Sequence, residues 1–133
     1  MKTKPALTAE DCEKIQAAAR AEAVKNKWNV TIAVVDDGGH VLSLIRGDGA
    51  SPVTAEIATQ KAHGAAVARR STKLAEDRIV QRPALIKMPV LPVQGGVPIM
   101  VKGECVGAVG VSGVQSHEDE QVCNAGIAAL GLQ

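Results

Sequence analysis

The stretch GGVPIMVKGECVGAVGVSG, residues 95–113, combines the pattern of two β-strands with an unusual number of glycines. Six of its nineteen residues are glycine, although glycine weakens a strand because it has no side chain to pack. The apolar runs VPIMV and CVGAVGV flank KGE, so Gly103 is predicted to form a hairpin turn. Gly107 and Gly110 must point to opposite faces of their strand. We therefore expect a helix, a subunit or a ligand to approach the backbone closely on each face.

A second hairpin is predicted upstream of this stretch. NVTIAVVD (29–36) and HVLSLIR (40–46) are joined by Asp37-Gly38-Gly39, which is typical of a tight turn because Asp and Gly tolerate positive φ. Along the first of these strands, apolar residues occur at both odd and even positions. Neither face is therefore expected to be open to water.

Helical spacing of apolar residues marks three further segments, and a fourth is mixed. Thr8 and Asp11 resemble a capping box, whereas Ser51 and Ser116 are each placed to act as an N-cap. The mixed segment predicts one or two short helical turns that end at Arg82-Pro83. The predicted helical segments are residues 8–26, 51–70, 72–88 (the mixed one) and 116–130. Residues 89–92, which begin and end with proline, are predicted to be irregular or an edge strand.

The composition indicates one globular domain over residues 1–133. Apolar residues make up 46% of the chain, but Phe and Tyr are absent and Trp28 is the only aromatic residue. The formal net charge of +1, with no basic run and no aromatic platform, argues against nucleic acid as a partner. No apolar run is long enough to span a membrane, and the N-terminus lacks the apolar core of a signal peptide. The three cysteines show no CxxC spacing, so we expect a reduced, cytoplasmic protein.

The strands of the first hairpin carry apolar side chains on both faces, whereas the helices that could cover them are rich in alanine. A lone chain would leave part of this apolar surface in water. We therefore predict a closed homo-oligomer built from dimers, with a dimer, tetramer or octamer as the final assembly.

Five residues are candidates for a ligand site: Gly95, Gly96, Lys61, His63 and Arg46. Lys61 lies in the apolar sector of its helix, so its stem either reaches out to solvent or directs the ammonium into a cleft where it attracts a carboxylate. Gly95 and Gly96 either form a sharp turn or expose two backbone N–H groups to an anion. His63 lies on the polar side of the same helix, either simply exposed or acting as an axial haem ligand or acid–base group.

The remaining motifs give weaker support for a functional site. Gly107, Gly110 and Gly113 do not have the spacing of a dinucleotide-binding loop, and Ser112 lacks the GxSxG context of a hydrolase nucleophile. His117-Glu118-Asp119 fans around the start of a helix and cannot converge on one metal ion, so we interpret it as part of the helix cap. No metal site and no catalytic residue are predicted.

Three segments, DDGGHVLSLIRGDGA, AEIATQKAHGAA and GGVPIMVKGECVGAVGVSG, resemble the GlcG/HbpS family of haem-degrading-like proteins, which includes the C-terminal domain of PduO-type adenosyltransferases. Among its members, the sequence is expected to lie nearest the OrfY-type proteins encoded with glycerol and diol dehydratases. The resemblance covers about residues 7–130 and implies a profilin-like α/β fold. In this fold a five-stranded antiparallel sheet carries helices on its faces and assembles into oligomers.

The resemblance implies two functional alternatives. The first is an oligomeric binding protein for haem or a related tetrapyrrole, with His63 as axial ligand and Lys61 or Arg46 paired with the propionates. The second is an auxiliary protein or small-molecule enzyme of glycerol or diol metabolism, in which Lys61 binds a carboxylate and the N–H groups of Gly95 and Gly96 stabilise an oxyanion.

Overall fold

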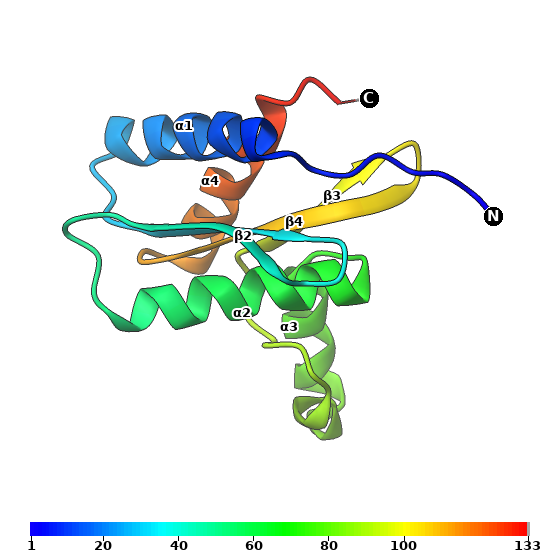
Figure 1. Cartoon of the computed structure of the whole chain (residues 1–133). Helices are drawn as coiled ribbons and strands as arrows, with labels where there is room; N and C mark the ends of the chain where they lie inside the picture. Colours follow the sequence, from blue (N-terminus) through cyan, green and yellow to red (C-terminus); the bar gives the residue numbers. More distant parts are fainter. Residues whose placement is uncertain (133) are drawn as a thin grey trace.

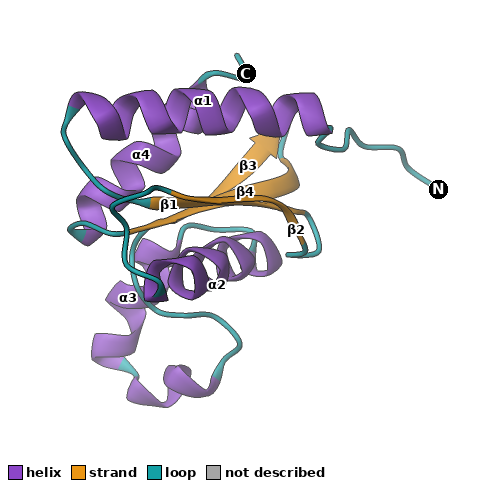
Figure 2. Cartoon of the chain, turned by 60° about the vertical axis from the view of Figure 1, so that its left-hand side comes forward, coloured by secondary structure: helices purple, strands orange, loops and turns teal. Residues whose placement is uncertain are grey.

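The computed structural model describes residues 1–132 and has three layers (Figure 1). A four-stranded antiparallel sheet has the order β2-β1-β4-β3. Helices α1 (Ala9–Lys25) and α4 (Ser116–Ala128) cover one face, α2 (Val53–Ala68) covers the other, and α3 (Thr72–Gln81) with the 3-10 helix η1 (Pro83–Lys87) extends away from α2 (Figure 2). The strands are β1 (Thr31–Asp36), β2 (Val41–Arg46), β3 (Gly96–Val101) and β4 (Glu104–Ser112).

The predicted α/β architecture is confirmed in outline, but the prediction of five strands is wrong, because residues 1–132 form four. The segment proposed as an edge strand, residues 89–92, is irregular. Pro89 and Pro92 have no N–H to donate to a neighbouring strand. The N–H of Val93 is used locally, in a 2.8 Å hydrogen bond to the carbonyl of Leu91.

The segment after α2 is more helical than the sequence indicated. Instead of one or two short turns, α3 is a helix of 10 residues. The hydroxyl of Ser71 accepts the N–H of Lys73 at 3.2 Å and caps the start of α3. The end at Arg82, directly before Pro83, is as predicted. The N-cap at Ser71 and the proline at position 83 set the two ends of this helix.

Two of the three predicted helix caps are corrected. The capping box of Thr8 and Asp11 is confirmed at the start of α1. At α4 the N-cap position is Gln115 rather than Ser116, and the Glu118 carboxylate accepts the N–H of Gln115 at 3.1 Å. The side chain of Ser51 makes no cap at α2, where the N-cap position is Pro52.

The sheet separates two apolar cores. The core under α1 and α4 contains the larger side chains, including Ile15, Ile32, Val34, Val109 and Val122. The core under α2 is built almost entirely from alanine: Ala33, Val35, Ala58, Ala62, Ala65, Ala66 and Ala108. Small side chains let α2 lie close to the sheet, and this close packing brings polar groups of α2 into the interior.

The glycines of residues 95–113 serve this close packing. A Cβ on Gly110 would overlap the carbonyl oxygen of Ala58 in α2, and one on Gly107 would overlap Leu7 on the opposite face. The expected close approach on both faces is confirmed, and the neighbours on these faces are segments of the same chain. Gly103 has φ +83° in the β3–β4 turn, as predicted for the second hairpin.

Strand β2 lies at an edge of the sheet and is exposed. Four of its six residues are large apolar residues with exposed fractions between 42% and 53%: Val41 49%, Leu42 44%, Leu44 42% and Ile45 53%. The opposite edge strand, β3, contains Pro98, which cannot donate to another strand. Of the two edges, β2 is therefore the one that lacks a natural block to pairing.

Candidate functional site

Lys61 and Asp119 form a buried ion pair between α2 and α4. The Nζ of Lys61 lies 3.0 Å from Oδ2 of Asp119 and donates to the carbonyl of Val111 at 3.0 Å. The side chains of Lys61 and Asp119 are 3% and 2% exposed. The interpretation that the Lys61 stem reaches solvent is therefore wrong. The ammonium points inward, and the carboxylate that it attracts belongs to the protein.

The surroundings of Asp119 complete a closed polar cluster. Oδ1 of Asp119 accepts the N–H of Val114 at 3.2 Å. Burial raises the pKa of Asp119, and the neighbouring Lys61 ammonium opposes that rise. Burial also raises the pKa of Cys123, whose thiol donates to the carbonyl of Gly95 at 3.2 Å, so Cys123 stays protonated. The cluster thus joins α2, β4 and α4 without leaving a free charge.

Asp119 is the residue that sequence analysis placed wrongly, as part of a helix cap. Glu118 is the capping carboxylate, and Asp119 faces the interior. A signal for this was present, because Asp119 shares its helical face with Val122, Cys123 and Gly126, which are all buried. The partner could not be predicted from sequence, because Lys61 lies 58 residues away.

Gly95 and Gly96 lie directly against Lys61. A Cβ on Gly95 would come 2.7 Å from Nζ of Lys61, and one on Gly96 would overlap the Lys61 carbonyl oxygen. The N–H of Gly96 is already donated to the hydroxyl of Thr72 at 2.9 Å. In this conformation Gly96 therefore offers no free N–H group to an anion. Both glycines are buried.

His63 and Arg46 lie apart from this cluster and from each other. The half-buried ring of His63 contacts the β1–β2 turn, with Nδ1 3.3 Å from the carbonyl of Gly39. Arg46, at the far end of β2, pairs with Thr31. Thr31 hydrogen-bonds Thr54 of α2, so Arg46 is on the α2 face of the sheet, because cross-strand partners share a face. The five candidate residues do not form one pocket.

A cavity of about 390 Å³ lies between the C-terminal half of α2, α3 and η1. We call it the α2–α3 cavity. Apolar side chains form most of its wall, and Arg70, Arg78 and Met88 are its longest polar or polarisable side chains. Neither arginine forms an ion pair with a carboxylate of residues 1–132. Its lining residues are Val67, Ala68, Arg70, Ser71, Leu74, Ala75, Arg78, Leu85, Met88, Val90 and Pro92.

Sequence analysis missed the α2–α3 cavity, although it nominated a residue beside it. His63 precedes Val67 by four residues, so it lies on nearly the same side of α2, about 6 Å further along the helix axis. The available signal was the spacing of Leu74 and Arg78, which places an apolar and a cationic side chain on one face of α3.

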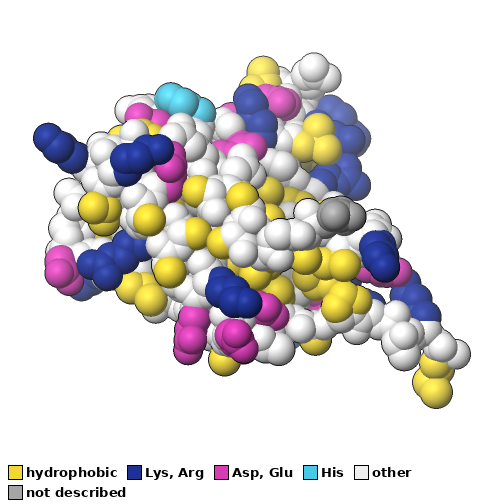
Figure 3. All heavy atoms as spheres, turned by 90° about the horizontal axis from the view of Figure 1, so that it is seen from above, with side chains coloured by type: hydrophobic (Ala, Val, Ile, Leu, Met, Phe, Trp, Pro, Cys, Tyr) yellow, Lys and Arg dark blue, Asp and Glu magenta, His cyan; other side chains and the backbone are white. Residues whose placement is uncertain are grey.

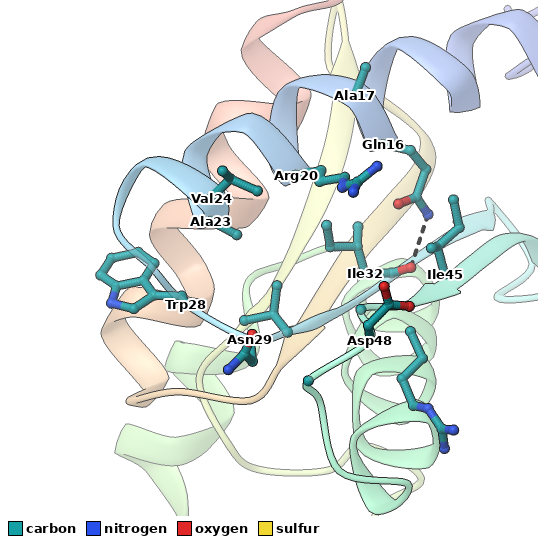
Figure 4. Close-up of a pocket in the computed structure, with 14 residues that line it drawn as sticks. Gln16, Ala17, Arg20, Ala23, Val24, Trp28, Asn29, Ile32, Ile45 and Asp48 are labelled. Carbon is teal, nitrogen blue, oxygen red and sulfur yellow. Dashed lines mark hydrogen bonds between the residues drawn. The ribbon is translucent and has the colours of Figure 1, made fainter.

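A second cavity, of about 500 Å³, lies between α1 and the end of β2 with the loop that follows (Figure 4). We call it the α1–β2 cavity. Arg20 and Trp28 come from the α1 side, and Asp48 comes from the loop after β2. Its floor is apolar, with Val30 and Ile32 of the β1 segment and Ile45 of β2. The two cavities lie on opposite sides of the sheet.

Other kinds of site find no support in residues 1–132. No group of three or more His, Cys, Asp or Glu side chains could hold a metal ion there. No helix within the same residues is long and apolar enough to cross a membrane. On the face seen in Figure 3, exposed apolar side chains lie among both basic and acidic ones, without the uniform positive charge of a nucleic-acid surface.

An antiparallel sheet with helices on both faces defines a small α+β protein, and a mostly apolar cavity lies at one side of the sheet. The family model described as "Haem degrading protein HbpS-like" matches residues 7–128. The chain therefore belongs to the HbpS-like family, which confirms the resemblance drawn from its sequence.

Two relatives support this family membership. Protein GlcG of Escherichia coli is 47% identical over 114 residues, which cover 84% of this chain and 85% of GlcG. An uncharacterised 15.0 kDa protein of the dhaT-dhaS intergenic region of Citrobacter freundii is 30% identical over 119 residues, 85% of this chain and 84% of that protein. Of these two, GlcG is the nearer.

Two solved structures have a fold similar to that of this chain. A crystal structure of a double mutant of Streptomyces reticuli HbpS has a TM-score of 0.90 at 35% identity, covering 98% of this chain and 91% of that one. A crystal structure described as the PduOC:haem complex has a TM-score of 0.88 at 24% identity, covering 97% and 98% of the two chains. At that identity the second likeness shows the fold alone.

Proposed function

We propose that this protein is a homo-oligomeric binding protein for haem or a related tetrapyrrole, and that the tetrapyrrole enters the α2–α3 cavity. The observation that carries the proposal is the chemistry of that cavity: an apolar wall, two arginines without carboxylate partners and one thioether. A volume of about 390 Å³ falls within the usual range of ligand pockets. The comparisons support the choice of ligand, since a haem complex has been solved for a protein of the same fold.

Each part of the cavity matches one part of a tetrapyrrole. Leu74, Leu85 and Val90 offer apolar surface to the flat macrocycle, where burial is favourable. Arg70 and Arg78 are placed to receive two carboxylates, and guanidinium groups bind carboxylates with paired, charge-assisted hydrogen bonds. These arginines replace Lys61 and Arg46 as the proposed partners of the propionates, because Lys61 is held by Asp119 and Arg46 lies elsewhere.

Two side chains are candidates for the axial ligand. Met88 lines the cavity, and its thioether is a haem ligand in other proteins. His63 stands one turn before the cavity on α2, and its Nε2 has no hydrogen-bond partner within residues 1–132. When bound, haem iron would supply redox or ligand-binding chemistry, and the residues described here would bind and orient the macrocycle.

The oligomeric part of the proposal rests on β2. The exposed apolar side chains of this edge strand lie on both of its faces, since Ile45 pairs with Ile32 on the α1 side and Leu44 with Ala33 on the α2 side. A second copy that pairs along β2 would cover both faces at once, and a two-fold axis makes such antiparallel pairing self-complementary. We therefore propose a dimer through β2 as the unit of any larger assembly.

Absorption spectroscopy with added haem tests the binding proposal and identifies the axial ligand. We expect a Soret shift for the wild type, and loss of the ligand-specific bands in either His63→Ala or Met88→Leu. Lys61 cannot serve here as a control, because its loss would disturb the core. Ile86→Ser, which changes an exposed residue outside the cavity lining, is the matched control and should leave the spectrum unchanged. An unaltered haem spectrum with the wild type would overturn the proposal.

An auxiliary or enzymatic role in glycerol or diol metabolism is the second candidate. It is favoured by the 30% identity to the Citrobacter freundii protein of the dhaT-dhaS region. A substrate carboxylate at Lys61 would have to displace Asp119, because the two side chains are paired at 3.0 Å. A screen of hydroxy acids and aldehydes for thermal stabilisation and turnover tests this role, which fails if none has an effect.

A further inference from the structure

The α1–β2 cavity plays no part in haem binding as proposed above, since it lies on the other side of the sheet. It is the larger of the two cavities, at about 500 Å³. Its floor and one end are apolar, formed by Ala23, Val24, Trp28, Val30 and Ile32. A pocket of this kind gains affinity from its apolar surface and selectivity from the few polar groups that converge on it.

Three charged residues line this cavity: Arg20, Asp48 and Arg46, and the position of Arg46 in β2 turns its side chain to the α2 face of the sheet. Arg20 extends from α1 and Asp48 from the loop after β2, and both side chains turn toward the space between them (Figure 4). They do not form an ion pair with each other or with any other charged side chain of residues 1–132. The cavity therefore presents a cation and an anion that are each free to bind a ligand group.

A third polar group is fixed beside them. Gln16 is only 7% exposed, and its amide NH₂ donates to the carbonyl of Ile32 at 2.9 Å and to the hydroxyl of Ser43 at 3.1 Å. These two bonds hold the amide in one orientation. Its carbonyl oxygen makes no hydrogen bond within residues 1–132, and no buried side-chain oxygen lacks a partner there. This oxygen therefore stays accessible and can accept a hydrogen bond from a ligand.

We propose that the α1–β2 cavity binds a zwitterionic ligand of the amino-acid type with an apolar side chain. The ligand carboxylate pairs with Arg20, and the ligand ammonium donates to Asp48 and to the carbonyl oxygen of Gln16. The apolar side chain lies against Val24 and Trp28 at the other end of the cavity. No activity is attached to this site, and it is independent of the haem proposal.

The presence of both a cation and an anion in the cavity favours a zwitterionic ligand over a ligand with one charge or none. A plain organic anion would satisfy Arg20 but would be repelled by Asp48, and a plain amine would meet the reverse problem. An uncharged apolar molecule would leave both charges without a partner. Only a ligand that carries both charges, beside an apolar group, satisfies all the features of the cavity.

Trp28 makes the proposal directly testable, because it is the only tryptophan of the chain. Its indole N–H gives a single resonance in a nitrogen-15 correlation spectrum, and that resonance belongs to the cavity wall. L-leucine and the dipeptide Leu-Leu, added at millimolar concentration, are expected to shift it in a saturable manner. N-acetyl-L-leucine, which lacks the ammonium, and L-leucinamide, which lacks the carboxylate, are expected to bind about tenfold more weakly or worse.

Two variants test whether Arg20 and Asp48 bind the two charged groups of the ligand. Arg20→Met and Asp48→Asn change exposed residues, so both are expected to fold as the wild type does, and each should weaken leucine binding by about tenfold. Arg82→Met, which changes an exposed arginine outside both cavities, is the matched control and should leave leucine binding unchanged. The proposal is overturned if neither leucine nor Leu-Leu shifts the Trp28 resonance. Equal binding of N-acetyl-L-leucine, or unchanged affinity in both variants, would also overturn it.

Discussion

The ammonium of Lys61 lies 3.0 Å from the carboxylate of Asp119, and both side chains are almost completely buried. Lys61 comes from the helix on one side of the sheet and Asp119 from the helix on the other, so the pair passes the end of the sheet and ties the two outer layers together. Burying two charges costs solvation free energy, which their mutual attraction and further hydrogen bonds offset.

Removing one member of this pair is expected to be costly. Lys61→Met leaves the Asp119 carboxylate buried without its cation, and the free energy of unfolding should fall by about 3–5 kcal/mol. The double variant Lys61→Met/Asp119→Leu leaves no charge behind and should be more stable than the single variant. Urea unfolding measures both. A loss below about 1 kcal/mol in the single variant would show that the pair contributes little.

Gly110 should not tolerate a side chain. In Gly110→Ala the new Cβ would overlap the Ala58 carbonyl oxygen and the backbone nitrogen of Ala62, so α2 would have to move away from the sheet. We expect a loss of about 1–3 kcal/mol or more in the free energy of unfolding. Gly38→Ala is the control, because its new Cβ would meet only side-chain atoms, of His40 at 3.2 Å and of Asp36 at 3.5 Å. Equal stability of the two variants would contradict this account.

The fold was predictable where local chemistry decides it. The capping box at Thr8, the Asp37-Gly38-Gly39 turn and the turn at Gly103 were recognised because a few neighbouring residues determine each of them. The fifth strand was predicted wrongly, because a short apolar segment between two prolines can be an edge strand or a loop. Only the tertiary contacts decide between the two, and within residues 1–132 this segment takes part in none of the strand pairings.

The site was less predictable, because it depends on segments that are far apart in sequence. The anomaly at Lys61 was visible, but its partner depends on how α4 packs. The apolar wall and the arginines of the α2–α3 cavity come from residues 67–92, and α3 in this range is longer than expected. The orientation of α3 against α2 creates the cavity, and no local pattern encodes that orientation.

The free energy of unfolding should depend on pH through the carboxyl group of Asp11. The N–H and hydroxyl of Thr8 hold the pKa of Asp11 below its ordinary value of 3.8. A carboxyl group with a lowered pKa in the folded state stabilises the fold above its unfolded pKa, and this contribution is lost as the pH falls through the folded value. Asp11→Asn should therefore be less stable than the wild type near neutral pH, by less than about 1 kcal/mol because solvent screens this partly exposed carboxylate.

Unfolding experiments between about pH 7 and about pH 3 test this prediction. The stability curves of wild type and Asp11→Asn should converge as the pH falls. Glu13→Gln, which changes an exposed carboxyl group of the same helix, is the matched control and should track the wild type. A constant difference between wild type and Asp11→Asn across the whole range would contradict the assigned cause.

The exposed apolar side chains of β2 should control assembly. The double variant Leu44→Glu/Ile45→Glu places charge on both faces of the strand, and sedimentation should show a smaller species than the wild type. Val80→Glu is the control, because Val80 is an apolar residue of α3 that is already 80% exposed. A wild-type species at the chain mass of 13.7 kDa, or an unaffected double variant, would exclude β2 as the interface.

The most direct test of the haem proposal is an equilibrium titration that compares Arg70→Leu/Arg78→Leu with Arg46→Leu. The first variant removes both cations of the α2–α3 cavity, whereas the second removes one that the structure places elsewhere. We predict that the wild type and Arg46→Leu bind haem with the same affinity and that the double variant binds about tenfold or more weakly. Equal affinity of all three proteins, or a loss confined to Arg46→Leu, would contradict the proposed site.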